Sequence, residues 1–81
     1  MLYIVTKVFT DSDLNSGLQE VEIFTSMEKV KEYVRDLHDD IMEYIGGVGD
    51  LEDTYKDGDT SFKIKHPIFR ISVDTSEREI N

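Results

Sequence analysis

The first part of the chain shows two apolar patterns that are typical of strands. Residues 2–9 are mostly β-branched or aromatic, and residues 20–24 alternate acidic and apolar side chains. Both patterns predict strands, the second with one side facing solvent. Residues 10–19 between them are rich in Asp, Ser, Asn and Gly, a composition typical of loops. We therefore expect the two strands to form an antiparallel hairpin.

A long amphipathic helix is predicted over residues 26–45. Apolar side chains recur at positions 27, 30, 34, 37, 41 and 44, and this spacing keeps them on one helix face. Thr25 and Glu28 match a capping box, in which each side chain accepts a hydrogen bond from the other's backbone amide. Gly46 and Gly47 predict the helix end, because glycine readily adopts the left-handed conformation found there.

The last third of the chain predicts further strands. Residues 51–55 are expected to form a third strand, and Asp57 and Gly58 are typical of a two-residue hairpin turn. Residues 61–73 have a strand-like composition throughout. Pro67 lies within them and cannot donate to a sheet ladder, so it marks an edge position, a bulge or a break.

The order β-β-α-β-β predicts an α+β fold with one long helix packed on a three- to four-stranded antiparallel sheet. Residues 1–74 are expected to form a single domain, and residues 75–81 a flexible C-terminal tail. One helix covers only one sheet face, yet the first strand has apolar residues on both sides: Leu2, Ile4 and Val8 against Tyr3, Val5 and Phe9. Because a small monomer rarely exposes a large apolar patch, one hypothesis is a homodimer that closes the uncovered face. Substitution of Tyr3, Val5 or Phe69 by a charged residue tests this hypothesis.

Length and composition restrict the class of protein. The chain has 81 residues and no cysteine, so it is one small domain without disulfides or thiolate metal sites. No apolar run approaches the roughly 18 residues of a membrane span. The N-terminus lacks the basic start and long apolar stretch of a signal peptide. We therefore expect a soluble, cytoplasmic protein with no membrane partner.

The acidic charge is concentrated in the middle of the chain. The formal net charge is −9, and residues 11–60 contain fifteen acidic side chains against four basic ones. On the predicted helix, acidic residues recur every three or four positions opposite the apolar stripe, and nothing basic relieves the second half. Acidic residues near a helix C-terminus oppose the helix dipole and repel one another. Such locally unfavourable arrangements are typical of functional sites.

We interpret this region as a surface for a basic partner, with a solvated helix face as the alternative. The predicted partner-binding residues are Asp36, Asp39, Asp40, Glu43, Asp50, Glu52, Asp53, Tyr55, Asp57 and Asp59. Direct binding of nucleic acid is not expected, because Lys63, Lys65 and Arg70 form too small a basic cluster.

In its small size, strong acidity and lack of cysteine, the chain resembles the small acidic inhibitors made by tailed phages. These include DNA-mimicking anti-CRISPR proteins, uracil-glycosylase inhibitors and inhibitors of the nucleoid protein HU. The resemblance covers composition and charge layout, so it assigns no residue a role. It implies an acidic mimic of nucleic acid that inhibits a basic DNA- or RNA-binding host or defence protein in the cytoplasm of a bacterial host cell. The alternative is the structural or regulatory homodimer.

Other chemistry is less well supported by the sequence. Asp11, Asp13, Asn15 and Glu22 occupy positions 1, 3, 5 and 12 of a calcium loop like that of an EF-hand, but Ser16 stands where the turn needs glycine. A calcium-binding module is therefore a third hypothesis, and an Asx-rich hairpin loop is the alternative. His38 is expected on the helix surface, and no catalytic or cofactor motif is found. We predict that the protein is not an enzyme and needs no cofactor.

Overall fold

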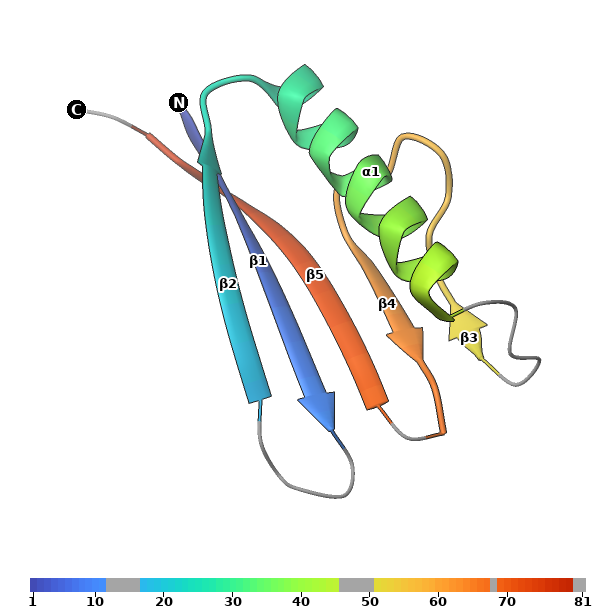
Figure 1. The fold of residues 1–81 in the computed structure, drawn as a ribbon. Helices are drawn as coiled ribbons and strands as arrows, with labels where there is room; N and C mark the ends of the chain where they lie inside the picture. The colour runs from blue at the N-terminus through green and yellow to red at the C-terminus, as the bar shows by residue number, and fades with distance from the viewer. Residues whose placement is uncertain (12–16, 46–50, 68, 80–81) are drawn as a thin grey trace.

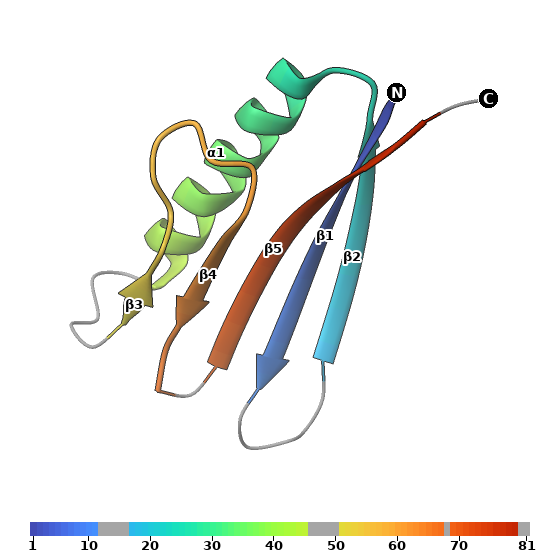
Figure 2. The ribbon, with the colours of Figure 1, turned by 180° about the vertical axis from the view of Figure 1, so that it is seen from behind.

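A five-stranded antiparallel sheet with one helix across one face forms the protein (Figures 1 and 2). The computed structural model describes residues 1–11, 17–45, 51–67 and 69–79. The elements are β1 (Leu2–Asp11), β2 (Gly17–Phe24), α1 (Met27–Ile45), β3 (Glu52–Asp53), β4 (Phe62–Lys65) and β5 (Phe69–Arg78). The strand order is β2-β1-β5-β4-β3. This confirms the α+β class and the single helix, with five strands where three to four were predicted.

Two hairpins carry most of the sheet. β1 and β2 pair antiparallel from Tyr3 opposite Phe24 to Thr10 opposite Gly17, which confirms the predicted hairpin. Both strands extend into residues 10–19, which were predicted to be a loop. β4 and β5 form the second hairpin, with Pro67 in its turn. The predicted strand over residues 61–73 is therefore two strands, because the chain reverses where proline has no amide for a ladder.

β5 lies at the centre of the sheet and extends farther than predicted. It pairs with β1 from Asp11 opposite Phe69 to Leu2 opposite Arg78. The predicted flexible tail over residues 75–81 is thus wrong for residues 75–78, which continue the strand. These residues are largely polar, so their composition does not indicate a strand. Backbone pairing with β1 holds them in the sheet.

The segment before β4 departs from the predicted hairpin. β3 has only two residues, and the Thr54 amide extends its pairing by donating to the Lys63 carbonyl at 3.1 Å. The predicted turn at Asp57 and Gly58 is present, because the Asp59 amide donates to the Lys56 carbonyl at 2.9 Å. Gly58 has φ of 89°, a conformation that glycine adopts without strain. The connection between β3 and β4 is therefore longer than two residues.

The helix begins one residue later than the capping box predicts. The Val30 amide donates to the Ser26 carbonyl at 3.1 Å, which makes Ser26 the residue that caps the helix. At the other end, Ile45 is buried whereas Tyr44 is 90% exposed. The apolar stripe therefore ends at Ile45, and not at Tyr44 as predicted. The helix is not apolar enough to cross a membrane, and no other helix occurs in the described residues.

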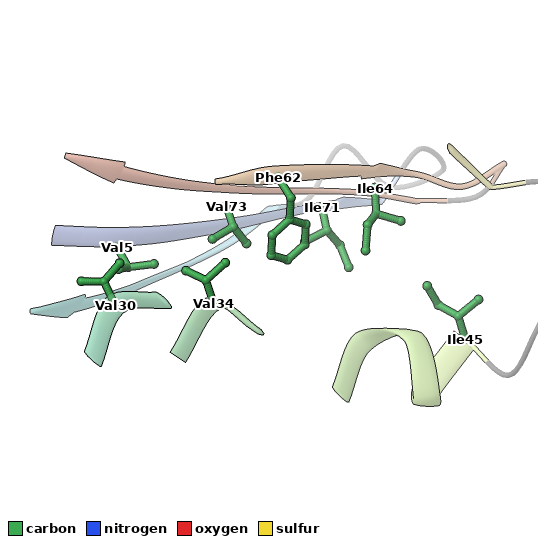
Figure 3. Packing of buried hydrophobic residues seen from close by; sticks show 8 residues of the cluster. All are labelled: Val5, Val30, Val34, Ile45, Phe62, Ile64, Ile71 and Val73. Carbon is green, nitrogen blue, oxygen red and sulfur yellow. The ribbon is translucent and has the colours of Figure 1, made fainter. Parts of the chain in front are cut away.

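The hydrophobic core lies between α1 and the sheet (Figure 3). Its buried members are Val5, Val30, Val34, Ile45, Phe62, Ile64, Ile71 and Val73. Tyr3 and Phe69 pack against this cluster from the same side of the sheet. A charged residue at Tyr3, Val5 or Phe69 would therefore disturb the core, and it would not test an uncovered face as the sequence analysis expected.

Candidate functional site

Four exposed carboxylates follow the second half of α1 on the side away from the sheet. We call Asp36, Asp39, Asp40 and Glu43 the acidic helix face. Their spacing of three or four residues places them within about two turns of one another. The Arg35 guanidinium lies 3.3 Å from the Asp36 carboxylate, but no described residue forms an ion pair with Asp40 or Glu43. The last turn of the helix contains no basic side chain, so this charge is not neutralised locally.

An apolar groove of about 530 Å³ lies beside the acidic helix face. Phe9 and Phe69 line it from the sheet, and their rings stack with centroids 5.5 Å apart. The remaining lining residues are Lys7, Leu37, Asp40, Ile41, Tyr44, Ile45 and Ile71. Asp40 therefore belongs both to the acidic helix face and to the groove. The two features form one continuous surface.

The groove exists because α1 packs against β2 in its first half and lies beside β4 in its second half (Figure 1). Near the helix start, Tyr33 packs against Phe24 of β2, with ring centroids 5.0 Å apart. Farther along, His38 packs against Phe62 of β4, with centroids 5.2 Å apart. The second half of the helix thus lies over β4 and leaves part of β1 uncovered. The apolar spacing of the helix does not predict this groove, because it does not encode the direction of the helix relative to the strands.

His38 connects the helix to the segment around β3. Its Nε2 atom lies 2.5 Å from Asp53 Oδ2, and its ring stacks on Tyr55 with centroids 4.3 Å apart. The His38 side chain is only 13% exposed and that of Asp53 21% exposed. The prediction that His38 lies on the helix surface is therefore wrong. Its ring lies close enough to the apolar stripe for Tyr55 and Phe62 to cover it.

Tyr55 and Asp53 were predicted to bind a partner, and both are engaged within the protein. Asp53 Oδ1 accepts a hydrogen bond from the Tyr55 amide at 2.9 Å. The Tyr55 hydroxyl is buried without a regular hydrogen bond to any described residue. Burial raises the pKa of Tyr55, and the negative charge of Asp57 raises it further, while hydrogen bonding from the Gly58 backbone amide lowers it. These two residues fix the 51–61 segment, and their side chains are engaged mainly in contacts within the protein.

The remaining predicted acids are divided between different places. Glu52 pairs in register with Lys65, on the sheet face opposite the helix, so it does not join the acidic helix face. Asp59 is half-buried, and its Oδ2 accepts a hydrogen bond from the Lys56 amide at 2.9 Å. Asp57 is exposed in the turn, and Asp50 lies outside the described residues. The predicted surface is thereby reduced to the acidic helix face and Asp57.

A small basic cluster lies on the sheet face that α1 does not cover. Lys63, Lys65 and Arg70 alternate with core residues, so they project from the face that α1 does not cover. They line a shallow cavity of about 390 Å³ there together with Val8, Thr10 and Ser72. The acidic helix face and this basic cluster therefore lie on opposite sides of the sheet, although Glu52 lies beside Lys65 within the basic side.

Those predicted calcium ligands that belong to the described residues do not lie close together. Asp13 and Asn15 lie outside them, as does the side chain of Asp11. Glu22 pairs with Val5 in the middle of β2, roughly 17 Å along the strand from Gly17. It therefore lies too far from the hairpin loop to complete a ligand set with Asp11. The described part of the chain contains no group of three potential metal ligands.

Comparisons with protein-family models, curated proteins and solved structures find no match to this chain.

Proposed function

We propose that the protein binds a basic, nucleic-acid-binding protein through the acidic helix face and the adjoining groove, and that it inhibits this partner by occupying its nucleic-acid site. One observation carries the proposal. Unpaired carboxylates on α1 stand directly beside an apolar groove, with Asp40 common to both. A surface kept acidic only for solubility does not need an adjoining groove.

The two parts of this surface make different contributions to binding. The carboxylates attract a basic partner over a distance, which raises the association rate and makes binding sensitive to salt. The groove can accept an apolar or aromatic anchor, and such anchors dominate the energetics of most interfaces. Tyr44 is 90% exposed at the groove, and tyrosine is enriched among the residues that contribute most to binding.

The spacing of the acids supports mimicry of nucleic acid. Four-residue steps on a helix advance about 6 Å along the axis, so the helix presents a rigid row of negative charges at regular intervals. DNA also presents regularly spaced negative charges, and proteins that bind it place Lys and Arg to neutralise them. A groove or arm adapted to phosphates can therefore accept the acidic helix face.

The test is capture of the partner from a nuclease-treated bacterial lysate by three baits. These are the original protein, the variant Asp36→Asn/Asp40→Asn/Glu43→Gln, and a control with the same change in net charge, Asp74→Asn/Glu77→Gln/Glu79→Gln. We expect the original and the control to capture one basic nucleic-acid-binding protein that high salt releases. The helix variant should lose it, and the captured protein should lose its nucleic acid when the original is added. Equal capture by all three baits, or capture of nothing, would contradict the proposal.

The homodimer is a second candidate, and the uncovered sheet face supports it. Val21 and Ile23 are 51% and 60% exposed there. Ile23 lies opposite the half-buried Ile4 of β1, so an apolar strip crosses both strands. Sedimentation equilibrium of the original and of Ile23→Lys tests this candidate. A dimer that Ile23→Lys dissociates supports it, and a monomer at all accessible concentrations contradicts it.

A further inference from the structure

β2 is an edge strand that offers a free backbone for pairing. It has eight residues and pairs with β1 on one side, while no described strand lies on its other side. Its pairing with β1 is continuous from Gly17 to Phe24, without a bulge. A strand of this length presents an unpaired edge of about 27 Å. Backbone donors and acceptors along such an edge can bind an additional strand.

The exposed apolar side chains of the protein gather on this strand. Five large apolar side chains are exposed in the described residues, and three of them, Leu18, Val21 and Ile23, belong to β2. Proteins usually protect an edge with lysine, proline, bulges or short strands. β2 contains no lysine or proline, and its only charged residues are Glu20 and Glu22. The two glutamates disfavour pairing with an acidic strand but leave the edge open to a basic one.

The two sides of β2 differ in chemistry. Glu20 lies opposite Lys7 and Glu22 opposite Val5, so both glutamates project on the helix side of the sheet. Val21 and Ile23 project on the other side. Leu18, near the start of β2, also projects on the helix side, because it lies opposite Phe9. From Glu20 to Ile23, a strand added at this edge would thus meet carboxylates on one face and apolar side chains on the other. Lys7 neutralises part of this charge, because its ammonium lies 3.1 Å from the Glu20 carboxylate.

We propose that the β2 edge binds an extended segment of a partner, in which basic and apolar side chains alternate, as a sixth strand of the sheet. The identity of the partner as a basic protein rests on the proposed function. The basic side chains would lie opposite Glu20 and Glu22, and the apolar ones opposite Val21 and Ile23. Backbone hydrogen bonds then provide affinity, and the alternation specifies register.

A second copy of the chain fits this edge less well. The two longest antiparallel registers between two copies of β2 are centred on Glu20 or on Val21. The first places Glu20 opposite Glu20 of the second copy, and the other places Glu20 opposite Glu22 twice. Like charges directly opposite each other destabilise a strand pair. Charge complementarity therefore favours a basic segment from a different protein.

The test uses terminally blocked peptides and the isotopically labelled full-length protein. One peptide alternates Lys and Val over about ten residues, which is enough to pair along the whole edge. The first control has the same residues in two blocks, and the second alternates but carries N-methylated amides on the pairing edge. Resonance shifts and amide hydrogen exchange locate the binding site by NMR.

We expect the alternating peptide to shift β2 resonances and to slow the exchange of its outward-facing amides about tenfold or more at saturation. Neither control peptide should protect them. Val21→Thr/Ile23→Thr keeps β-branched residues at exposed positions and should weaken binding on the order of tenfold. Glu20→Gln/Glu22→Gln should weaken it and reduce its salt dependence.

The results distinguish this proposal from the proposed function. Shifts confined to the acidic helix face, equal for the alternating and block peptides, would overturn the edge proposal and leave the helix surface in place. Protection of β2 that persists in the Asp36→Asn/Asp40→Asn/Glu43→Gln variant would support the edge even if the helix surface failed. Protection of β2 that grows with protein concentration, without peptide, would overturn the proposal in favour of a second copy.

Discussion

The ring contacts of Tyr55 determine where its side chain lies, and they bury its hydroxyl away from water. Its ring stacks on His38 at 4.3 Å and meets Phe62 edge-on, with centroids 5.7 Å apart. These contacts bury the hydroxyl, which has no regular hydrogen bond to a described residue. A buried hydroxyl whose described partner, the Gly58 amide, is not in regular hydrogen-bond geometry lowers stability, because in the unfolded chain it is fully hydrated.

We therefore expect Tyr55→Phe to leave the free energy of unfolding unchanged or to raise it by up to about 1 kcal/mol. Urea denaturation at neutral pH measures this change. If the Tyr55 hydroxyl bound the partner, Tyr55→Phe would also reduce the affinity for that partner. A loss of stability of more than about 1 kcal/mol would show that the hydroxyl makes a favourable bond in the folded protein.

Tyr55 and Tyr33 also determine the behaviour of the protein in alkali. Burial raises the pKa of both, and the charges of Asp57 at Tyr55 and of Glu22 at Tyr33 raise it further. The stabilising contribution is fully present below the unfolded pKa of about 10 and is lost as the pH rises through the higher folded values. Stability measured by urea denaturation should therefore fall above pH 10. The fall should be shallower in Tyr55→Phe and shallowest in the double variant with Tyr33→Phe. An identical slope in all three proteins would contradict the burial of these hydroxyls.

At the scale of elements, the acidic side chains in the second half of α1 destabilise the helix. Asp40 and Glu43 lie near the C-terminus of the helix, where acidic side chains oppose its dipole, and no described residue pairs with them. We expect Asp40→Asn/Glu43→Gln to stabilise the protein by a few tenths of a kcal/mol to about 1 kcal/mol at low salt. Thermal melting at low and high salt measures the effect, which salt should reduce.

The same pair of substitutions should weaken binding to a basic partner while it raises stability. Opposite effects on stability and binding distinguish a functional surface from a solvated helix face. The control is Glu77→Gln/Glu79→Gln, which changes the net charge equally at the end of β5, away from the groove. If Asp40→Asn/Glu43→Gln lowered the melting temperature at low salt, local repulsion in the helix would be excluded.

The His38–Asp53 contact connects two elements that are distant in the sequence. The pair is mostly shielded from solvent, and its Nε2 to Oδ2 distance is 2.5 Å. A double-mutant cycle with His38→Ala and Asp53→Ala should give a coupling free energy of roughly 0.5–3 kcal/mol. Hydrogen exchange should show that either single variant increases opening of the 51–61 segment. A coupling near zero would mean that the two side chains contribute independently.

At the scale of the whole molecule, the two sheet faces have different tolerance to charge. Val5 is 1% exposed beneath α1, whereas Ile23 is exposed on the uncovered face. Val5→Asp should unfold the domain, because it buries an unpaired carboxylate. Ile23→Asp should change stability by no more than about 0.5 kcal/mol. Circular dichroism and urea denaturation measure both. A large loss for Ile23→Asp would show that the outer face is covered in solution.

The candidate site was predictable in part. The acidic helix face follows directly from helical spacing, so Asp36, Asp39, Asp40 and Glu43 were predicted and lie together. Asp53, Asp59 and Glu52 were grouped with them by sequence proximity. The fold separates them because alternate strand residues face opposite ways and turns bind carboxylates to backbone amides. The groove depends on how α1 crosses the sheet, a property of packing between elements.

The sequence by itself determined the local features of this protein. Strand alternation, the apolar stripe of α1, the turn at Gly58 and the break at Pro67 are each set within a few residues, where steric and hydrogen-bonding preferences act. Only the tertiary structure decided which sheet face α1 covers, that β5 lies between β1 and β4, and that β2 remains at the edge. These choices depend on contacts between residues far apart in the chain. Local conformational preferences carry no information about those contacts. Burial of the shared hydrophobic core stabilises the arrangement that forms them.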